Sequence, residues 1–246
     1  MNETIVGATS LPLLQLLGMP SCEVPDGGQP RLGHKPLFLL ARLLLETRPV
    51  ARETMMAFLW PEASEERARG SLRQALHVIR AATGPDCVAA DRRSISVRVP
   101  PACDLTDFLQ AVRVGEWQQA ALAYRGPLLE GVTVADATDA ELWLDFQRRR
   151  IAKMFETAAV SALDAPPNTS HGADRLAVAR RLRDHDPRQS RSWRYLFDEL
   201  GAIHAESELR LEKAALGALI ESRQIDDATA AVGMLAEQGL RRAAGN

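Results

Sequence analysis

Cysteine and lysine are scarce in this chain of 246 residues. The three cysteines, Cys22, Cys87 and Cys103, lie far apart and are odd in number. Neither a disulfide framework nor a CxxC metal or redox site fits such spacing, so we expect a reducing cytoplasm. Three lysines stand against 27 arginines, a bias typical of a GC-rich bacterial genome.

Long apolar runs and a strong net charge are also missing. Residues 11–22 are apolar, but the preceding segment MNETIVGATS contains Glu3 and no Lys or Arg. It therefore lacks the cationic start of a signal peptide, and no apolar stretch approaches the ~20 residues of a membrane span. A net charge of -2 excludes a polybasic protein, so any anionic partner must bind to a local cluster of basic residues. We expect a cytoplasmic chain with no membrane partner.

Motifs for catalysis, metals and nucleotides are absent too. The sequence contains no HExxH, HxH, GxGxxG, GxxxxGK[ST] or GxSxG. Acids of the tryptophan-containing helices, such as Asp139, Glu141 and Asp145, are spaced as on an ordinary solvated helix. We therefore expect no enzyme, no catalytic residue, no metal site and no cofactor.

The first hundred residues contain signals for both strands and helices. Residues 13–33 hold short apolar runs broken by Gly and Pro, which predicts a small antiparallel sheet of three or four strands. Residues 34–49 predict a helix that is buried on two faces, because apolar side chains cover both sides. Residues 50–61 predict a second, short helix that ends at Pro61.

A third helix is predicted between Glu65 and Thr83. Ser64 suits its N-cap, the glutamates of its first turn suit the helix dipole, and Gly84 follows its end. At 100° per residue, one side of this helix is apolar and the opposite side is polar. The apolar side consists of Ala68, Leu72, Ala75, Leu76 and Ile79.

Residues 87–100 alternate in polarity and predict a hairpin with Asp91, Arg92 and Arg93 at its tip. A sheet, three helices and a hairpin make a winged helix, in which the outer face of the third helix enters a DNA major groove. Residues 67–98 carry seven arginines and two acids, a local charge of +5 that suits phosphate. A plain alternative is that these arginines only keep the helix soluble and that the module docks proteins.

The second half differs in charge and pattern. Residues 105–246 carry 18 basic and 21 acidic residues, so we do not expect this half to bind DNA alone. Helical periodicity dominates it, with breakers between the segments. We expect helices near 105–113, 116–123, 139–163, 173–185, 190–202, 205–221 and 226–238.

Three segments of the chain resemble one known family. They are FLWPEASEERARGSLRQALHVIR at 58–80, AYRGPLLEGV at 123–132 and ELWLDFQRRRIAKMFETAAVSAL at 141–163. In this order they resemble the antibiotic-regulatory-protein (SARP) family of bacterial transcriptional activators, over about residues 12–222. The resemblance implies a mostly α fold with a small β component. It comprises an N-terminal tail (1–10), a response-regulator-type winged helix-turn-helix (11–103) and an all-α, tetratricopeptide-like bacterial transcriptional activator domain, BTAD (104–240).

The resemblance also implies a role and a set of DNA contacts. Such a protein binds double-stranded promoter DNA at repeated sites and helps RNA polymerase holoenzyme engage, in the cytoplasm at the nucleoid. Arg and Gln suit guanine and adenine edges, and hydroxyls reach phosphates. The expected DNA-binding residues are Arg67, Arg69, Ser71, Arg73, Gln74, His77, Arg80, Arg92 and Arg93. Gly70 and His77 depart from the family pattern, which bears on base preference more than on fold.

Several alternatives stay open at this point. Larger regulators of this kind carry a nucleotide-binding module or a receiver segment, and neither is seen here, so we expect no ATP or phosphorylation switch. The helical half suits dimerisation, polymerase contact or signal input. Direct repeats fit two copies in tandem, whereas a symmetric homodimer fits a palindrome. Repression uses the same contacts as activation, and a protein-interaction adaptor that has lost DNA binding is the alternative of another class.

Overall fold

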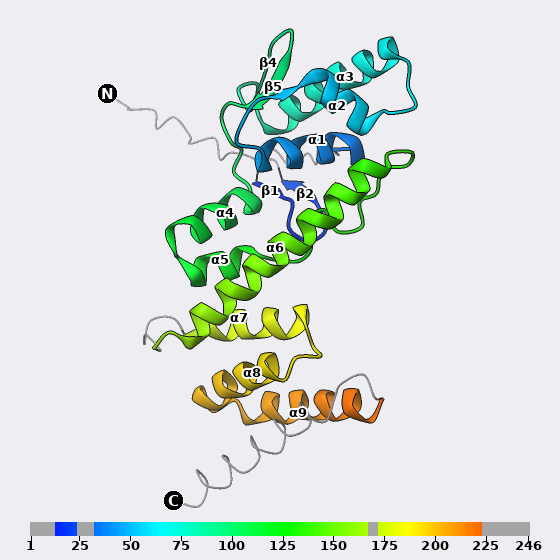
Figure 1. The fold of residues 1–246 in the computed structure, drawn as a ribbon. Coiled ribbons are helices and arrows are strands. Elements are labelled where there is room, and N and C mark those ends of the chain that lie inside the picture. Colours follow the sequence, from blue (N-terminus) through cyan, green and yellow to red (C-terminus); the bar gives the residue numbers. More distant parts are fainter. Residues whose placement is uncertain (1–12, 24–31, 167–171, 223–246) are drawn as a thin grey trace, which may run out of the picture. The chain divides into compact units, whose positions relative to one another are not determined.

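A computed structural model describes residues 13–23, 32–166 and 172–222 of the chain (Figure 1). Of these residues, those within Met1–Gln110 and Ala123–Lys153 form one compact unit, called unit 1 here. Those within Ala111–Leu122 and Met154–Asn246 form unit 2. The predicted domain boundary at 103/104 falls inside unit 1 and stays a prediction, and the predicted tail at 1–10 lies outside the described residues.

The described chain starts with a hairpin of two strands, β1 (Leu13–Gln15) and β2 (Ser21–Glu23), which pair antiparallel. The expected three- or four-stranded sheet is therefore not found among the described residues, and residues 24–31 lie outside them. The hairpin pairs instead with distant parts of the chain. The amide of Leu14 donates to the Ala102 carbonyl at 2.9 Å, and Leu17 forms an antiparallel bridge with Leu128.

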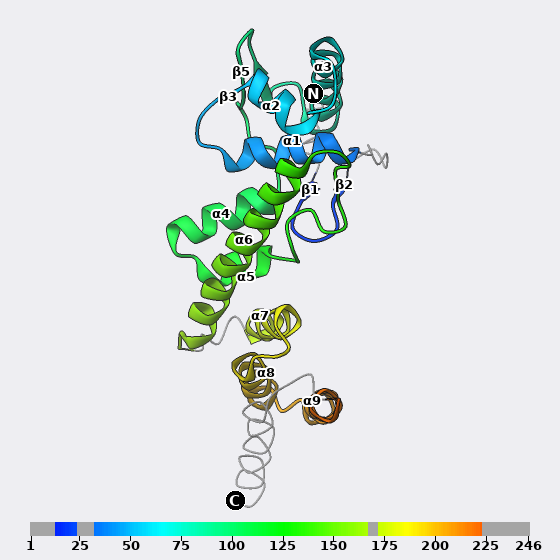
Figure 2. The ribbon, with the colours of Figure 1, turned by 45° about the vertical axis from the view of Figure 1, so that its right-hand side comes forward.

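Three helices follow, as predicted: α1 (His34–Leu45), α2 (Arg52–Leu59) and α3 (Glu65–Thr83). Ser64 is the N-cap of α3, because its hydroxyl accepts from the Arg67 amide at 3.4 Å. The apolar stripe of α3 is buried throughout, and α1 is buried on two faces. Helix α1 lies between the β1–β2 hairpin and the α2–α3 pair (Figures 1 and 2).

A second sheet completes the winged helix. Its strands are β3 (Val50–Ala51), β4 (Val88–Ala90) and β5 (Ser94–Val97), in the order β3-β5-β4 and antiparallel throughout. The predicted hairpin at 87–100 is confirmed, with residues 91–93 at its tip. The second helix begins later than predicted, at Arg52, because Val50 pairs with Ile95 and buries its side chain in the sheet.

The segment 123–132, which resembles a family signature, joins the first hairpin to the rest of unit 1. The Leu129 amide donates to the Leu16 carbonyl at 2.8 Å, and the Gly18 amide donates to the Pro127 carbonyl at 2.9 Å. A Cβ atom at Gly126 would lie 3.0 Å from the Gly18 Cα. A side chain at this position would therefore force the two backbones slightly apart, which favours glycine.

Helix α4 (Asp104–Val114) begins at a buried carboxylate. The two carboxyl oxygens of Asp104 accept from the amides of Leu16 and Leu17, at 2.7 and 3.1 Å. Burial nevertheless raises the pKa of this carboxyl above its ordinary value. Asp104 thus satisfies two buried backbone donors of the first hairpin, at the cost of removing a carboxylate from water.

Helix α5 (Trp117–Ala123) precedes the long helix α6 (Thr138–Asp164). The first half of α6 packs on the winged helix through Trp143. Its ring lies 5.8 Å from that of Phe58 and 6.5 Å from that of Phe38, centroid to centroid. The Arg42 guanidinium lies 3.9 Å from the Phe58 centroid. This aromatic and cationic cluster makes α1, α2 and the start of α6 one packed body.

Unit 2 contains α7 (Gly172–His185), α8 (Ser190–Ala202) and α9 (Glu206–Glu221), which stack in sequence order, seen nearly end-on in Figure 2. Arg175, which is buried, donates to the Leu163 carbonyl at 2.8 Å and to Glu199 at 2.7 Å, so it joins the end of α6 to α8. The six predicted helices between 105 and 221 are confirmed within one or two residues, and the helix expected at 226–238 lies outside the described residues.

The helices of the described ranges are too short or too polar to cross a membrane, and none of them combines the length and the apolar character that a span requires.

The raised pKa of Asp104 gives a pH-dependent stability that an Asp104→Asn variant removes. The folded state favours the protonated carboxyl, so this group stabilises most below its unfolded pKa of about 3.9. Its contribution falls as pH rises through the higher folded pKa. Urea unfolding of both proteins from pH 4 to pH 7 is expected to show wild type losing stability relative to the variant. A difference that grows in favour of wild type with pH would contradict the assignment.

Candidate nucleic-acid interface

The outward side of α3 carries polar and charged side chains: Arg67, Gln74 and His77 lie roughly opposite the buried stripe, Arg73 lies on the flank it shares with Arg69, and Ser71 lies nearer the stripe. Arg67, Arg73, Gln74 and His77 are exposed, and Ser71 is half-buried. The stripe Leu72, Leu76 and Ile79 is at most 3% exposed, so the rotation of the helix about its axis is fixed by its core. The structure thus leaves four of the nine expected residues, Arg67, Arg73, Gln74 and His77, on the solvent-facing side of α3, with Ser71 at its margin.

Arg69 also lies on α3 and is exposed, but it is engaged within the helix. Its guanidinium forms a hydrogen bond and ion pair with Glu65, one turn earlier. An exposed pair of this kind contributes little stability and is screened by salt. It does reduce the positive field that Arg69 presents to a ligand.

Arg80 differs from the other arginines of α3 because it is half-buried and bonded to the wing. Its Nε and one terminal nitrogen donate to the Val88 carbonyl, at 3.1 and 2.9 Å. Val88 is the first residue of β4. Arg80 therefore holds the hairpin against α3, and this contact sets the distance between the helix and the wing.

The wing tip is organised by the exposed carboxylate of Asp91. One of its oxygens accepts from the amides of Arg93 and Ser94, both at 2.7 Å, and the other accepts from the Ser94 hydroxyl at 3.0 Å. These hydrogen bonds hold the pKa of Asp91 below its ordinary value. The resulting tight turn leaves the side chains of Arg92 and Arg93 exposed.

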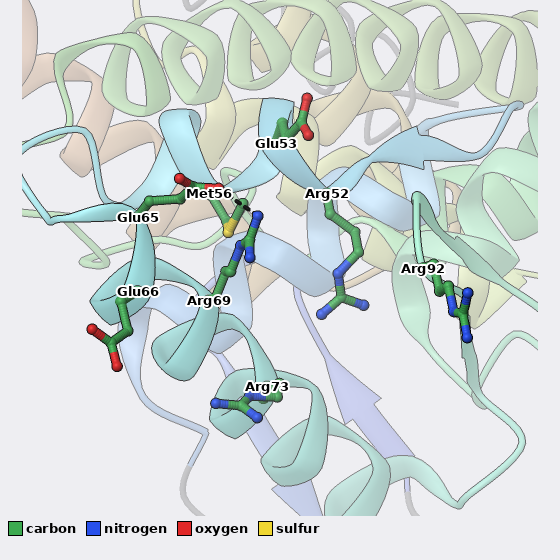
Figure 3. Close-up of a pocket in the computed structure, with 8 residues that line it drawn as sticks. All are labelled: Arg52, Glu53, Met56, Glu65, Glu66, Arg69, Arg73 and Arg92. Atoms are coloured by element: carbon green, nitrogen blue, oxygen red, sulfur yellow. Dashed lines mark hydrogen bonds and ion pairs between the residues drawn. The ribbon is translucent and has the colours of Figure 1, made fainter.

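A hollow of about 570 Å³ lies between α2, α3 and the wing (Figure 3). Arginines from all three elements line it. Its lining residues are Arg52, Glu53, Met56, Glu65, Glu66, Arg69, Arg73 and Arg92. Since Arg69 is paired with Glu65, the cationic part of the hollow is the side formed by Arg52, Arg73 and Arg92.

Arg52 was not among the residues expected from the sequence. It is the first residue of α2, its guanidinium donates to the Asp91 carbonyl at 3.2 Å, and its amide donates to the Arg93 carbonyl at 2.9 Å. The sequence does show a basic residue at the start of the second predicted helix, and this signal could have identified Arg52. Its position beside the wing depends on the pairing of β3 with β5, which the sequence did not reveal.

Metal-ligating side chains do not gather in the described parts of the chain. No group of three or more His, Cys, Asp or Glu side chains is placed there to hold a metal ion. All three cysteines are free and buried, and burial, together with the neighbouring charge of Asp104, raises the pKa of Cys103 to about 12.

Comparison with known proteins gives a structural likeness but no family match. No protein-family model and no curated protein matches the chain. The chain is similar to the solved structure of Mycobacterium tuberculosis EmbR in complex with a low affinity phosphopeptide. The TM-score is 0.46 and the sequence identity 21%, over 94% of this chain and 70% of that chain.

The role of Asp91 in the wing tip is tested by two substitutions. Asp91→Ala removes every side-chain acceptor of the turn, so amide hydrogen exchange at Arg93 and Ser94 is expected to quicken several-fold. Asp91→Asn keeps one oxygen for the two amides and serves as the matched control. The pKa of Asp91 is lower in the folded state than in the unfolded state. The wild-type tip is therefore expected to be fully protected from exchange above the unfolded pKa, and to lose this protection as pH falls through the folded pKa. Equal exchange in both variants at neutral pH would contradict this assignment.

Proposed function

We propose that this chain is a sequence-specific DNA-binding transcription regulator of the SARP type. It binds repeated sites beside a promoter and acts in the cytoplasm at the nucleoid. The observation that supports this most is the polar face of α3, which shares one side of unit 1 with arginines of α2 and the wing. A winged helix that presents such a face to solvent suits a major groove with flanking phosphates.

The side chains divide into two groups by reach and chemistry. Arg73, Gln74 and His77 are proposed to contact base edges, since they are exposed along the middle of α3 and can pair with purine edges. Phosphate contacts are proposed for residues at the edges of this surface, because a contact to phosphate does not depend on the base sequence. The proposed phosphate contacts are Arg67, Ser71, Arg92, Arg93 and, in addition to those expected, Arg52.

Arg69 and Arg80 are proposed to act mainly through other residues. Arg80 positions the wing through Val88, and Arg69 is held by Glu65. Glu65 and Glu66 line the hollow on the side away from Arg92, whereas Glu53 lies beside Arg52 (Figure 3). The negative charge of Glu65 and Glu66 repels phosphate on that side, so the duplex backbone is directed to the side of Arg52 and Arg92.

In vitro, Arg73→Ala is expected to weaken specific binding by roughly tenfold to a hundredfold, the range for a base contact. The measurement is a mobility shift on DNA from upstream of the protein's own gene, with nonspecific duplex as competitor. Arg210→Ala, an exposed arginine of α9, is the matched control and is expected to bind like wild type. Unchanged binding by the Arg73 variant would remove this residue from the interface.

The wing arginines make a separate prediction about salt dependence. Arg92→Ala combined with Arg93→Ala is expected to lower the slope of log affinity against log salt by about 2, or about 0.9 for each phosphate that is no longer neutralised. Arg52→Ala is expected to lower it by about 1 on the same basis. Both changes are expected to weaken binding to specific and to nonspecific duplex by similar factors. A weakening confined to one DNA sequence would instead assign these arginines to base reading.

Engagement of RNA polymerase holoenzyme is the further step of the proposal. Transcription reconstituted from purified holoenzyme and the upstream promoter is expected to rise when the chain is added. A fall in transcript at the same protein concentration would mean that the bound chain blocks the promoter and acts as a repressor.

A protein-interaction adaptor is the second candidate, and one observation favours it. The hollow is lined by four arginines and three glutamates, so its net field is weak. If no upstream duplex is retained at any salt concentration while the chain remains folded, unit 1 is a docking module and not a reader.

A further inference from the structure

The outer face of the first half of α6 has two large apolar side chains exposed to solvent. Leu142 is 63% exposed and Phe146 is 57% exposed, and they are one helical turn apart. The opposite side of the helix is buried, at Ala140, Leu144 and Ile151. Unit 1 therefore already packs against the far side of α6 and leaves this face open.

The charges on this face are arranged with opposite signs at its two ends. Asp139 lies near the start of the helix and Arg149 lies about 15 Å further along, at 1.5 Å per residue. Both are exposed, and within the described part of the chain neither side chain has a hydrogen bond or ion pair. The four residues, Asp139, Leu142, Phe146 and Arg149, fall within roughly 80° of arc, and we name them the α6 face.

This pattern is complementary to itself when it is turned end to end. If a second α6 helix lies antiparallel, with residue 144 opposite residue 144, Leu142 of each copy meets Phe146 of the other. Asp139 of each copy then meets Arg149 of the other. A patch that matches its own reverse is the requirement for a two-fold symmetric contact. An acidic or a basic peptide would match only one end of the face.

We propose that the α6 face is a homodimer contact, and that its partner is a second copy of this chain. Two apolar side chains and one ion pair for each half make a small contact, so the pair forms weakly, as transient interfaces do. The association does not depend on DNA binding. If the chain also reads DNA as proposed above, a pair related by a two-fold axis fits an inverted repeat, and a tandem pair would fit a direct repeat.

Charge reversal, compared with the association of wild type, tests this contact. The full chain is studied without DNA by sedimentation velocity, from micromolar to near-millimolar concentration. Wild type is expected to sediment faster as concentration rises. Asp139→Arg alone places two arginines against each other at both ends, and Arg149→Asp alone places two aspartates together. Each variant by itself is expected to stay monomeric over the same range.

An equal mixture of the two charge variants is expected to associate again. In the mixed pair, Arg at 139 of one copy meets Asp at 149 of the other, and the two remaining native side chains, Arg149 and Asp139, also meet. Association of wild type together with rescue on mixing is the result expected for the antiparallel contact, because a parallel wild-type pair would place Asp139 against Asp139 and Arg149 against Arg149. No rescue, or wild type that stays monomeric throughout, would overturn it.

The apolar part of the contact has its own matched control. Leu142→Asp is expected to weaken association at least about tenfold, because the leucine is replaced on both copies of the pair. Leu211→Asp changes a leucine of α9 that is 70% exposed and is expected to associate like wild type. Urea midpoints equal to wild type show that each variant is folded, since every substituted side chain is exposed. Equal association of the two leucine variants would contradict the assignment.

Discussion

Burial of the apolar stripe of α3 is the constraint on which the reading surface depends. Leu72, Leu76 and Ile79 are nearly inaccessible to water, and each such side chain contributes about 1.5–3 kcal/mol on burial. If the helix were turned so that its polar side faced the core, this stabilisation would be lost and charged side chains would be buried without partners. The direction in which Arg73, Gln74 and His77 project is therefore decided by residues that touch no ligand.

The wing depends on the same helix through different forces. Arg80, in the last turn of α3, donates hydrogen bonds to the carbonyl of Val88, the first residue of β4. Strand β3 pairs with β5 along the opposite edge of the hairpin. Asp91 then closes the tip with acceptors for two amides. Polar contacts of modest individual strength thus position the wing arginines, and hydrophobic packing positions the helix. Both are needed for one surface to span α2, α3 and the hairpin.

Unit 1 extends well past the three helices and the wing. Trp143 of α6 packs against Phe38 and Phe58, and the segment 123–132 is bonded to the first hairpin. A contact made on the outer face of α6 is consequently a contact of the same packed body that holds α3. This is the physical reason why pairing through α6 would fix how two reading helices are related.

The sequence by itself determined the helices, the wing hairpin and the polar face of α3. These follow from periodicity, capping and turn residues, which act over a few neighbours: Ser64 caps α3 as predicted, and Asp91 closes the tip. Interactions between distant residues were decided only by the tertiary structure. The hydrogen bond of Leu14 to Ala102, the bridge of Leu17 to Leu128, the place of Arg52 beside the wing and the bond of Arg80 to Val88 are of this kind. No local pattern records which backbone group a long side chain or a short strand will meet, since that depends on how the whole unit packs.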